Sequence, residues 1–111
     1  MTNEKNKISI LVLDDDTFIL KTIEHILHHN DFKNTTMASS VEIATTHLKD
    51  PDSINIILMD LNMPTTDGIE FFRILEDKNY KGGVILISGE DAQTIALAKN
   101  LAQVRNLNIL G

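Results

Sequence analysis

Short apolar runs alternate with amphipathic stretches along the chain. Residues 8–13, 54–59 and 84–87 are almost continuously apolar and rich in β-branched side chains, which is typical of strands buried on both faces of a sheet. Residues 32–38 contain more Asn and Thr, a composition that favours an edge strand, and residues 107–110 begin a last strand. Together these runs predict the strands of one sheet.

Amphipathic helices are expected between the strands, because apolar side chains there recur every three or four residues. Asp16 or Thr17 is the expected cap of the first helix, which ends near residue 30. The second helix is expected over residues 41–49 after a cap at Ser39-Ser40. The remaining helices are expected over residues 68–77 and from Asp91 to about residue 105.

The apolar spacing also predicts which side of two helices faces the sheet. The predicted stripe of the first helix consists of Ile19, Leu20, Ile23, Ile26 and Leu27. The predicted inner face of the helix over residues 68–77 consists of Ile69, Phe72 and Leu75. Phe71, Phe72 and Ile74 are not expected to face inward together, so one of them is expected to be exposed.

Strands that alternate with helices indicate an α/β fold. Buried strands joined by helical crossovers form a parallel sheet covered on both faces, and the right-handed rule for these crossovers leaves a doubly wound sheet as the leading topology. Such sheets bind ligands at the carboxyl ends of their strands, where the strand order reverses. The strand ends of this chain carry Asp14-Asp15, Asp60 and Ser88.

Length and composition fit one globular domain over residues 1–111, with no output domain. The chain has 111 residues, 42% of them hydrophobic, and a formal net charge of −6, which argues against direct binding to nucleic acid. It contains no cysteine, and no apolar stretch approaches the roughly 18 residues of a membrane span. The N-terminal residues lack the apolar segment of a signal peptide, so a cytoplasmic protein is expected.

Carboxylates follow two of the expected buried strands. Asp14-Asp15-Asp16 comes after the first strand, and Asp60 ends the apolar run over residues 54–59. If these strands are parallel neighbours, at least three carboxylates meet at one edge of the sheet. Like charges at that distance raise each other's pKa or require a cation. A solvated turn with a helix cap is the plainer interpretation of Asp14-Asp15-Asp16 taken alone.

At these residues the chain resembles the receiver domain of two-component response regulators. The resemblance covers nearly the whole sequence. It depends on four matches in order, which are Asp14-Asp15, the run Met59-Asp60-Leu61-Asn62-Met63-Pro64, Asp67-Gly68 and Ser88-Gly89-Glu90. It implies a flavodoxin-like fold of five parallel strands flanked by helices. Pro64 and Asp67-Gly68 are interpreted as loop geometry and capping.

The resemblance also implies a role for each site residue. Asp60 is then the phosphoacceptor, which takes a phosphoryl group from a phosphohistidine on a sensor histidine kinase or phosphotransfer protein. Asp15, Asp60 and the backbone carbonyl of Asn62 are the implied Mg²⁺ ligands, and Asp14 assists through a bound water. Ser88 is the implied switch hydroxyl. The chain would then signal to a separate effector and catalyse its own phosphorylation and dephosphorylation, without being a conventional turnover enzyme.

Two further expectations come from details of the family pattern. The pair Asn62 and Glu90 resembles fast-resetting chemotaxis-type regulators, which implies rapid decay of the phosphoryl group. The family also places a lysine at the end of the fifth strand, followed by a fifth helix, whereas this sequence ends at Gly111. A fragment of a longer regulator and a naturally short protein both fit that ending. A missing helix would expose apolar surface beside the first helix, so a homodimer through that face is a hypothesis.

Two alternatives belong to other functional classes. The absent lysine also fits a degenerate receiver that acts as a phosphorylation-independent interaction or dimerisation module. Asp14-Asp15-Asp16-Thr17 superficially resembles a phosphohydrolase of the haloacid dehalogenase type, but its spacing differs and the chain is too short for that fold. His25, His28 and His29 are interpreted as a solvated helix end, with a metal site as the minority alternative.

Overall fold

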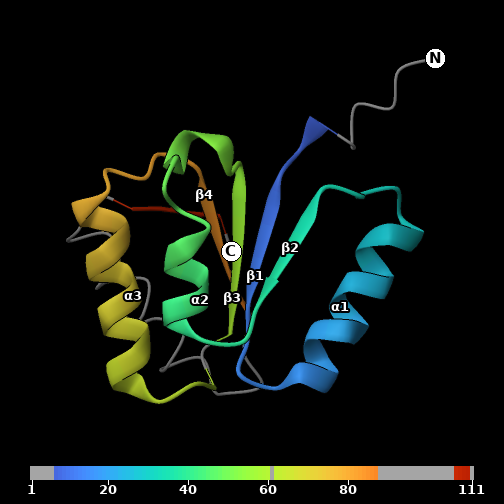
Figure 1. Ribbon diagram of the computed structural model, residues 1–111, viewed down its shortest axis with the longest axis horizontal. Coiled ribbons are helices and arrows are strands. Elements are labelled where there is room, and N and C mark those ends of the chain that lie inside the picture. The colour runs from blue at the N-terminus through green and yellow to red at the C-terminus, as the bar shows by residue number, and fades with distance from the viewer. Residues whose placement is uncertain (1–6, 61, 88–106, 111) are drawn as a thin grey trace.

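The computed structural model describes residues 7–60, 62–87 and 107–110 (Figure 1). Strands and helices alternate through these residues as the sequence predicts. In chain order the elements are β1 (Ile10–Leu13), α1 (Thr17–His29), β2 (Thr35–Ala38), α2 (Val41–Thr46), the short 3-10 helix η2 (Pro51–Ser53), β3 (Ile56–Asp60), α3 (Thr65–Asp77), β4 (Gly83–Ile87) and β5 (Asn108–Ile109). The helix predicted from Asp91 to about residue 105 lies outside the described residues.

The strands form one five-stranded sheet in the order β2-β1-β3-β4-β5, and every neighbouring pair is parallel. This arrangement confirms the doubly wound parallel sheet and the edge position of β2. The chain moves from β1 outward to β2 and then back across β1 to β3. The strand order therefore reverses between β1 and β3, whose register pairs Leu13 with Met59 at their carboxyl ends.

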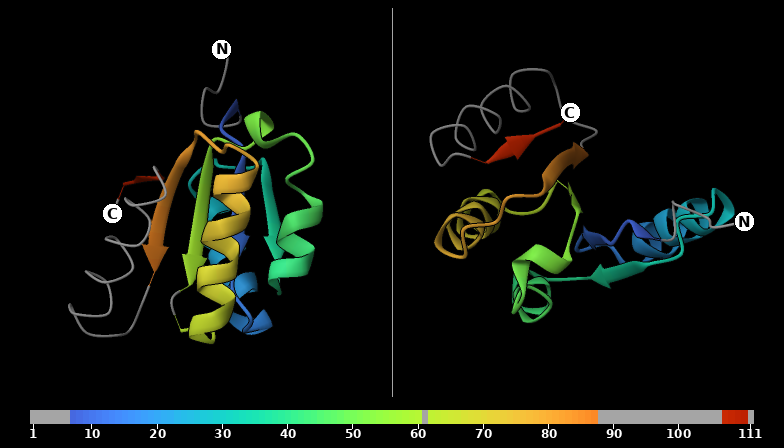
Figure 2. Two further views of the ribbon diagram at one scale, coloured as in Figure 1. Left: turned by 90° about the vertical axis from the view of Figure 1, so that its left-hand side faces the viewer. Right: turned by 90° about the horizontal axis from the view of Figure 1, so that it is seen from above.

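Helices cover both faces of the sheet. Figure 2 shows α2 and α3 on one face and α1 on the other. The larger core lies under α2 and α3 and includes the fully buried side chains of Leu11, Ile57 and Phe71. A smaller cluster of Ile10, Val12 and Leu20 lies under α1. These cores fix β1 and β3 side by side in the middle of the molecule.

The α1 helix is capped as predicted, but its buried stripe is narrower. The Asp16 side chain accepts hydrogen bonds from the N–H groups of Phe18 and Ile19 at 2.9 and 3.3 Å. Leu20 is buried, whereas Ile19 and Ile26 are 38% and 53% exposed. The prediction that all five apolar residues of the stripe face inward is therefore wrong. Leu20, Ile23 and Leu27 belong to the cluster with Ile10 and Val12. At about 100° per residue, Ile19 and Ile26 lie together at the other edge of the stripe, away from that cluster.

The inner face of α3 differs from the predicted one. Phe71, Phe72 and Leu75 are buried, and Ile69 is 41% exposed. The prediction that Ile69 faces the core is therefore wrong. Phe71, Phe72 and Ile74 do not all lie in the core, as expected, but Ile74 is partly buried and none of the three is exposed. At about 100° per residue, Phe71, Phe72 and Leu75 span one side of the helix, and Ile69 lies more than about 100° from the middle of that side.

The boundaries of three elements differ slightly from the predicted ones. Residues 8 and 9 precede β1, although Ser9 forms hydrogen bonds with Asn55 through both its N–H and its carbonyl. Helix α2 ends at Thr46, earlier than predicted, and the Ser40 side chain caps it. Helix α3 begins at Thr65 and includes Gly68, which was expected to start it. In the described part of the chain, no helix is both long and apolar enough to cross a membrane.

Candidate functional site

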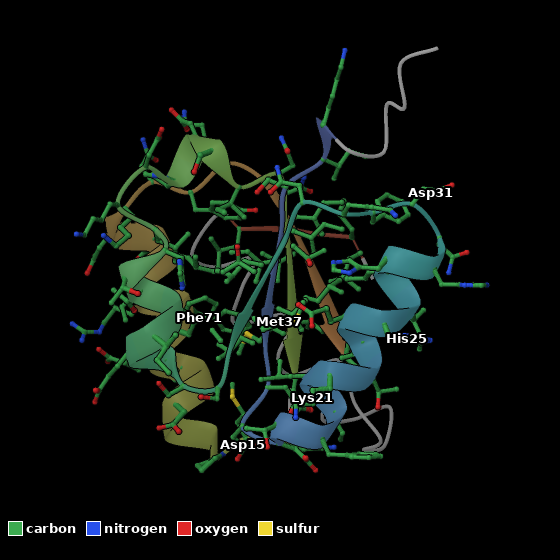
Figure 3. All side chains as sticks on the ribbon, turned by 45° about the vertical axis from the view of Figure 1, so that its right-hand side comes forward. Asp15, Lys21, His25, Asp31, Met37 and Phe71 are labelled. Carbon is green, nitrogen blue, oxygen red and sulfur yellow. The ribbon has the colours of Figure 1, made fainter. Side chains whose placement is uncertain are left out.

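The carboxyl ends of β1 and β3 bring three aspartates together. Asp14 follows β1 directly, and Asp60 is the last residue of β3. One carboxylate oxygen from each of Asp14, Asp15 and Asp60 lies within 4.8 Å of the others. Figure 3 shows Asp15 at the end of the molecule where α1 begins. The expected convergence of carboxylates at this edge of the sheet is thus confirmed, and we call these three residues the acidic cluster.

The members of the acidic cluster differ in their exposure to solvent. Asp14 is 3% exposed and Asp60 is 5% exposed, and they are the buried charged side chains among the described residues. Asp15 is exposed. The cluster therefore has two carboxylates anchored in the protein and one at its open side, where an ion or a phosphoryl donor can approach.

Backbone N–H groups orient the two buried carboxylates. The N–H of Asp16 donates to Asp14 Oδ1 at 2.8 Å. The N–H of Asn62 donates to Asp60 Oδ1 at 2.9 Å. In both cases the donor lies two residues after the carboxylate, in a turn that begins as the strand ends. Each loop therefore fixes the direction of the carboxylate that precedes it.

Burial raises the pKa of Asp14 above its ordinary value of 3.8. The hydrogen bond from the Asp16 N–H opposes this shift, and the carboxylates of Asp60 and Asp15 add to it. Burial and the neighbouring carboxylates both disfavour the ionised form of Asp14, because the side chain loses water and gains like-charged neighbours. A cation in the cluster would remove the repulsion and favour the ionised carboxylates.

The donor set of the acidic cluster fits Mg²⁺. This ion prefers hard oxygen ligands, is held by one or two carboxylates, and keeps several of its waters. Asp14, Asp15 and Asp60 supply such oxygens, and the exposure of Asp15 leaves room for retained water. The site offers no thiolate or imidazole among these residues, so softer ions gain no preferred ligand here.

Other residues that the sequence singled out fall in different places. Ser88 and Glu90 lie outside the described residues. Asn62 is exposed, and its N–H contacts Asp60 as given above. Pro64 is the N-cap residue of α3, and Asp67 is an exposed acidic residue in its first turn. Pro64 stands at the entry of α3 as interpreted, whereas Asp67 and Gly68 lie within the helix, so their interpretation as loop and cap residues is wrong.

The structure adds one site contact that the sequence interpretation missed. Asp16 was predicted to be only a helix cap, and its side chain does cap α1. Its backbone N–H also binds the Asp14 carboxylate, so the start of α1 and the acidic cluster share one residue. An Asp at a strand end only allows such a turn, because the donor is a backbone N–H that any residue other than proline would supply.

A doubly wound parallel sheet with an acidic cluster at its reversal point is the arrangement that the resemblance to receiver domains implied. The family model for the response regulator receiver domain matches residues 10–106. The chain therefore belongs to the response regulator receiver domain family, as the resemblance implied.

Solved structures share the fold. The chain is 31% identical to a response regulator from Colwellia psychrerythraea, with a TM-score of 0.81 over 94% of this chain and 81% of that chain. A CheY-like receiver domain protein from Methanospirillum hungatei JF-1 is 19% identical, with a TM-score of 0.73 over 92% of this chain and 78% of that chain. Because the second structure is only 19% identical to this chain, its similarity supports the fold alone.

Curated relatives are longer than this chain. The cell cycle response regulator CtrA from Brucella ovis is 35% identical over 81 residues, which are 72% of this chain and 34% of CtrA. The two-component response regulator EHD1 from Oryza sativa subsp. indica is 29% identical over 86 residues, which are 78% of this chain and 25% of EHD1. The likeness thus covers only a quarter to a third of these two relatives.

Proposed function

We propose that this receiver domain accepts a phosphoryl group on Asp60 from the phosphohistidine of a sensor histidine kinase or phosphotransfer protein. The observation that carries the proposal is the acidic cluster, in which Asp14, Asp15 and Asp60 present oxygens within 4.8 Å of one another at the reversal point of the sheet. Asp60 ends the central strand β3 and is held by the Asn62 N–H, so its carboxylate has a fixed direction. A fixed carboxylate is a suitable nucleophile.

In the proposed reaction an oxygen of the Asp60 carboxylate attacks the phosphorus atom. The new bond is the O–P bond of an acyl phosphate, and the bond that breaks is the P–N bond of the donor phosphohistidine. The imidazole leaves with that electron pair and takes up a proton. Asp60 needs no general base, because it reacts as a carboxylate.

Asp14, Asp15, Asp60 and the carbonyl of Asn62 are the residues proposed to hold Mg²⁺. The ion supplies positive charge that offsets the carboxylates and the phosphoryl oxygens. Asp14 contributes from a buried position, and the Asp16 N–H keeps its Oδ1 oriented. Ser88 is proposed, from the family resemblance, to donate its hydroxyl to a phosphoryl oxygen.

Phosphorylation by a small donor tests this proposal. The protein is incubated with MgCl₂ and acetyl phosphate, and its intact mass is measured. We expect a gain of one phosphoryl group that disappears with EDTA and in Asp60→Asn. Asp67→Asn is the matched control, since Asp67 is an exposed carboxylate in the loop-helix segment after Asp60. An unmodified wild-type protein would instead support the degenerate receiver, which acts without phosphorylation.

The lifetime of the modification tests a second part of the proposal. The side chains of Asn62 and Glu90 stand two residues after the proposed phosphoacceptor and the proposed switch hydroxyl. By analogy with fast-resetting members of the family, the phosphoryl group is expected to be lost quickly once the donor is removed. A phosphoryl group that persists for many hours in magnesium buffer would contradict this expectation. The effector that reads the phosphorylated state is proposed to be a separate protein.

A further inference from the structure

Two histidines on α1 lie side by side on the surface, away from the acidic cluster. His25 and His29 are both exposed, and their rings are stacked with centroids 6.4 Å apart and planes at 18°. Figure 3 shows His25 on the part of α1 that faces away from the sheet. His28 on the same helix is engaged elsewhere, because its Nε2 forms a hydrogen bond of 2.9 Å with Thr35 Oγ1.

The spacing of the pair is that of a helical metal chelate. Side chains four residues apart lie on the same face of a helix, one turn above the other. Two histidines at this spacing are the arrangement by which helices present imidazole nitrogens to Zn²⁺. Because both rings are exposed and almost parallel, rotation about their side-chain bonds can turn one nitrogen of each toward a common ion.

We propose that His25 and His29 bind one divalent transition-metal ion as a bidentate pair, with water completing its coordination. Imidazole suits Ni²⁺, Cu²⁺ and Zn²⁺, whereas carboxylate and carbonyl oxygens suit Mg²⁺. The chain would then have two metal sites with different chemistry, of which only the acidic cluster takes part in phosphoryl transfer.

The two sites are well separated along α1. Asp16 caps the helix beside the acidic cluster, while His29 is its last residue. At about 1.5 Å per residue, the histidine pair lies roughly 14–20 Å along the helix from that cap. An ion on the pair therefore has no contact with Asp14, Asp15 or Asp60, and the two sites are expected to bind their ions independently.

Calorimetric titration with NiCl₂ tests the proposal. Tag-free protein is titrated in excess MgCl₂, so that the hard ion competes at the acidic cluster. We expect one Ni²⁺ per chain, with an affinity that falls on the order of a hundredfold in both His25→Ala and His29→Ala, because each variant loses the chelate. His47→Ala is the matched control, since His47 is an exposed histidine at the end of α2 and should leave the affinity unchanged.

Two further measurements keep the result unambiguous. Circular dichroism checks that the exposed substitutions leave the helix content intact. In NMR spectra, paramagnetic Ni²⁺ should broaden the ring signals of His25 and His29 at concentrations that leave those of His47 sharp. The proposal is overturned if wild-type protein binds no Ni²⁺, if either alanine variant keeps the wild-type affinity, or if Asp15→Asn removes the binding instead.

Discussion

Asp14 and Asp60 lie buried next to each other at the ends of the neighbouring strands β1 and β3, with 3% and 5% of their surfaces exposed. Two carboxylates in such a position repel each other and lose hydration, so the protein without a bound cation carries a cost for keeping them ionised. The same pair gives a cation its ligands. The stability of the protein and the occupancy of its proposed Mg²⁺ site should therefore be linked.

Replacing Asp14 by Asn should stabilise the protein without Mg²⁺ and reduce the further stability that Mg²⁺ provides. The amide can still accept the Asp16 N–H, while the buried charge is removed. In EDTA we expect Asp14→Asn to raise the free energy of unfolding by on the order of 1 kcal/mol. In MgCl₂ the variant should gain less stability than wild type, because one contributor to the ion site is gone.

Thermal unfolding of both proteins in EDTA and in MgCl₂ measures the stability of each and its gain with Mg²⁺. Asp52→Asn is the control, since Asp52 is an exposed carboxylate in η2, which precedes the amino end of β3, whereas the cluster lies at its carboxyl end. Equal Mg²⁺ responses in wild type and Asp14→Asn would contradict the assignment of Asp14 to the ion site.

The raised pKa of Asp14 predicts a pH dependence of stability without Mg²⁺. Below its ordinary pKa of 3.8, Asp14 is protonated in both the folded and the unfolded chain and costs nothing. Between 3.8 and the raised pKa, the folded protein holds the proton more tightly than the unfolded chain, so the free energy of unfolding falls as pH rises. Above the raised pKa the loss is complete.

Urea unfolding of wild type and Asp14→Asn over this pH range isolates the effect. The difference in unfolding free energy, wild type minus variant, should decrease with rising pH, since only wild type carries the titrating carboxylate. A difference that stays constant or increases with pH would show that the folded state does not favour the protonated form of Asp14.

The cap of α1 gives a prediction about a residue that also touches the acidic cluster. The Asp16 carboxylate accepts from the N–H groups of Phe18 and Ile19. Asp16→Ala should therefore lower the free energy of unfolding by about 1 kcal/mol, while Asp16→Asn should change it by only a few tenths. Chemical denaturation compares the two variants. Equal losses in both would mean that the negative charge, and not the cap, is what matters.

The burial of two apolar residues of α3 distinguishes the observed orientation of this helix from the predicted one. Phe71 is fully buried, whereas Ile69 is 41% exposed. Truncating a buried Phe costs about 3–5 kcal/mol, so Phe71→Ala should strongly destabilise the protein. Ile69→Ala is the matched control on the same helix and should cost well under half as much. Similar losses in both variants would contradict the orientation of α3 described above.

The sequence predicted the elements of the sheet and the meeting of the carboxylates because both depend on simple patterns. Apolar runs mark the buried strands. Parallel strands bring Asp14 and Asp60 to one edge of the sheet, and this does not depend on how the helices are oriented. The burial of Phe71 in place of Ile69 was not predictable, because the five apolar residues of α3 allow more than one orientation and tertiary packing selects among them.

The second role of Asp16 was also hidden in the sequence. A side-chain cap is visible as a residue type at a helix start, whereas a backbone N–H that binds a neighbouring carboxylate depends on the path of the loop. The roles of Asp60 and Asn62 in phosphoryl transfer came from family resemblance, and the geometry of the described residues supports them without testing them.

Asp60 is the residue proposed to carry the phosphoryl group. After incubation with acetyl phosphate and MgCl₂, borohydride reduction converts an acyl phosphate of aspartate into stable homoserine, which tandem mass spectrometry locates in the peptide sequence. We expect homoserine at position 60, in wild type and in Asp67→Asn, and nowhere else. Homoserine at Asp14 or Asp15, or none at any position of a protein that has gained the mass of a phosphoryl group, would contradict it.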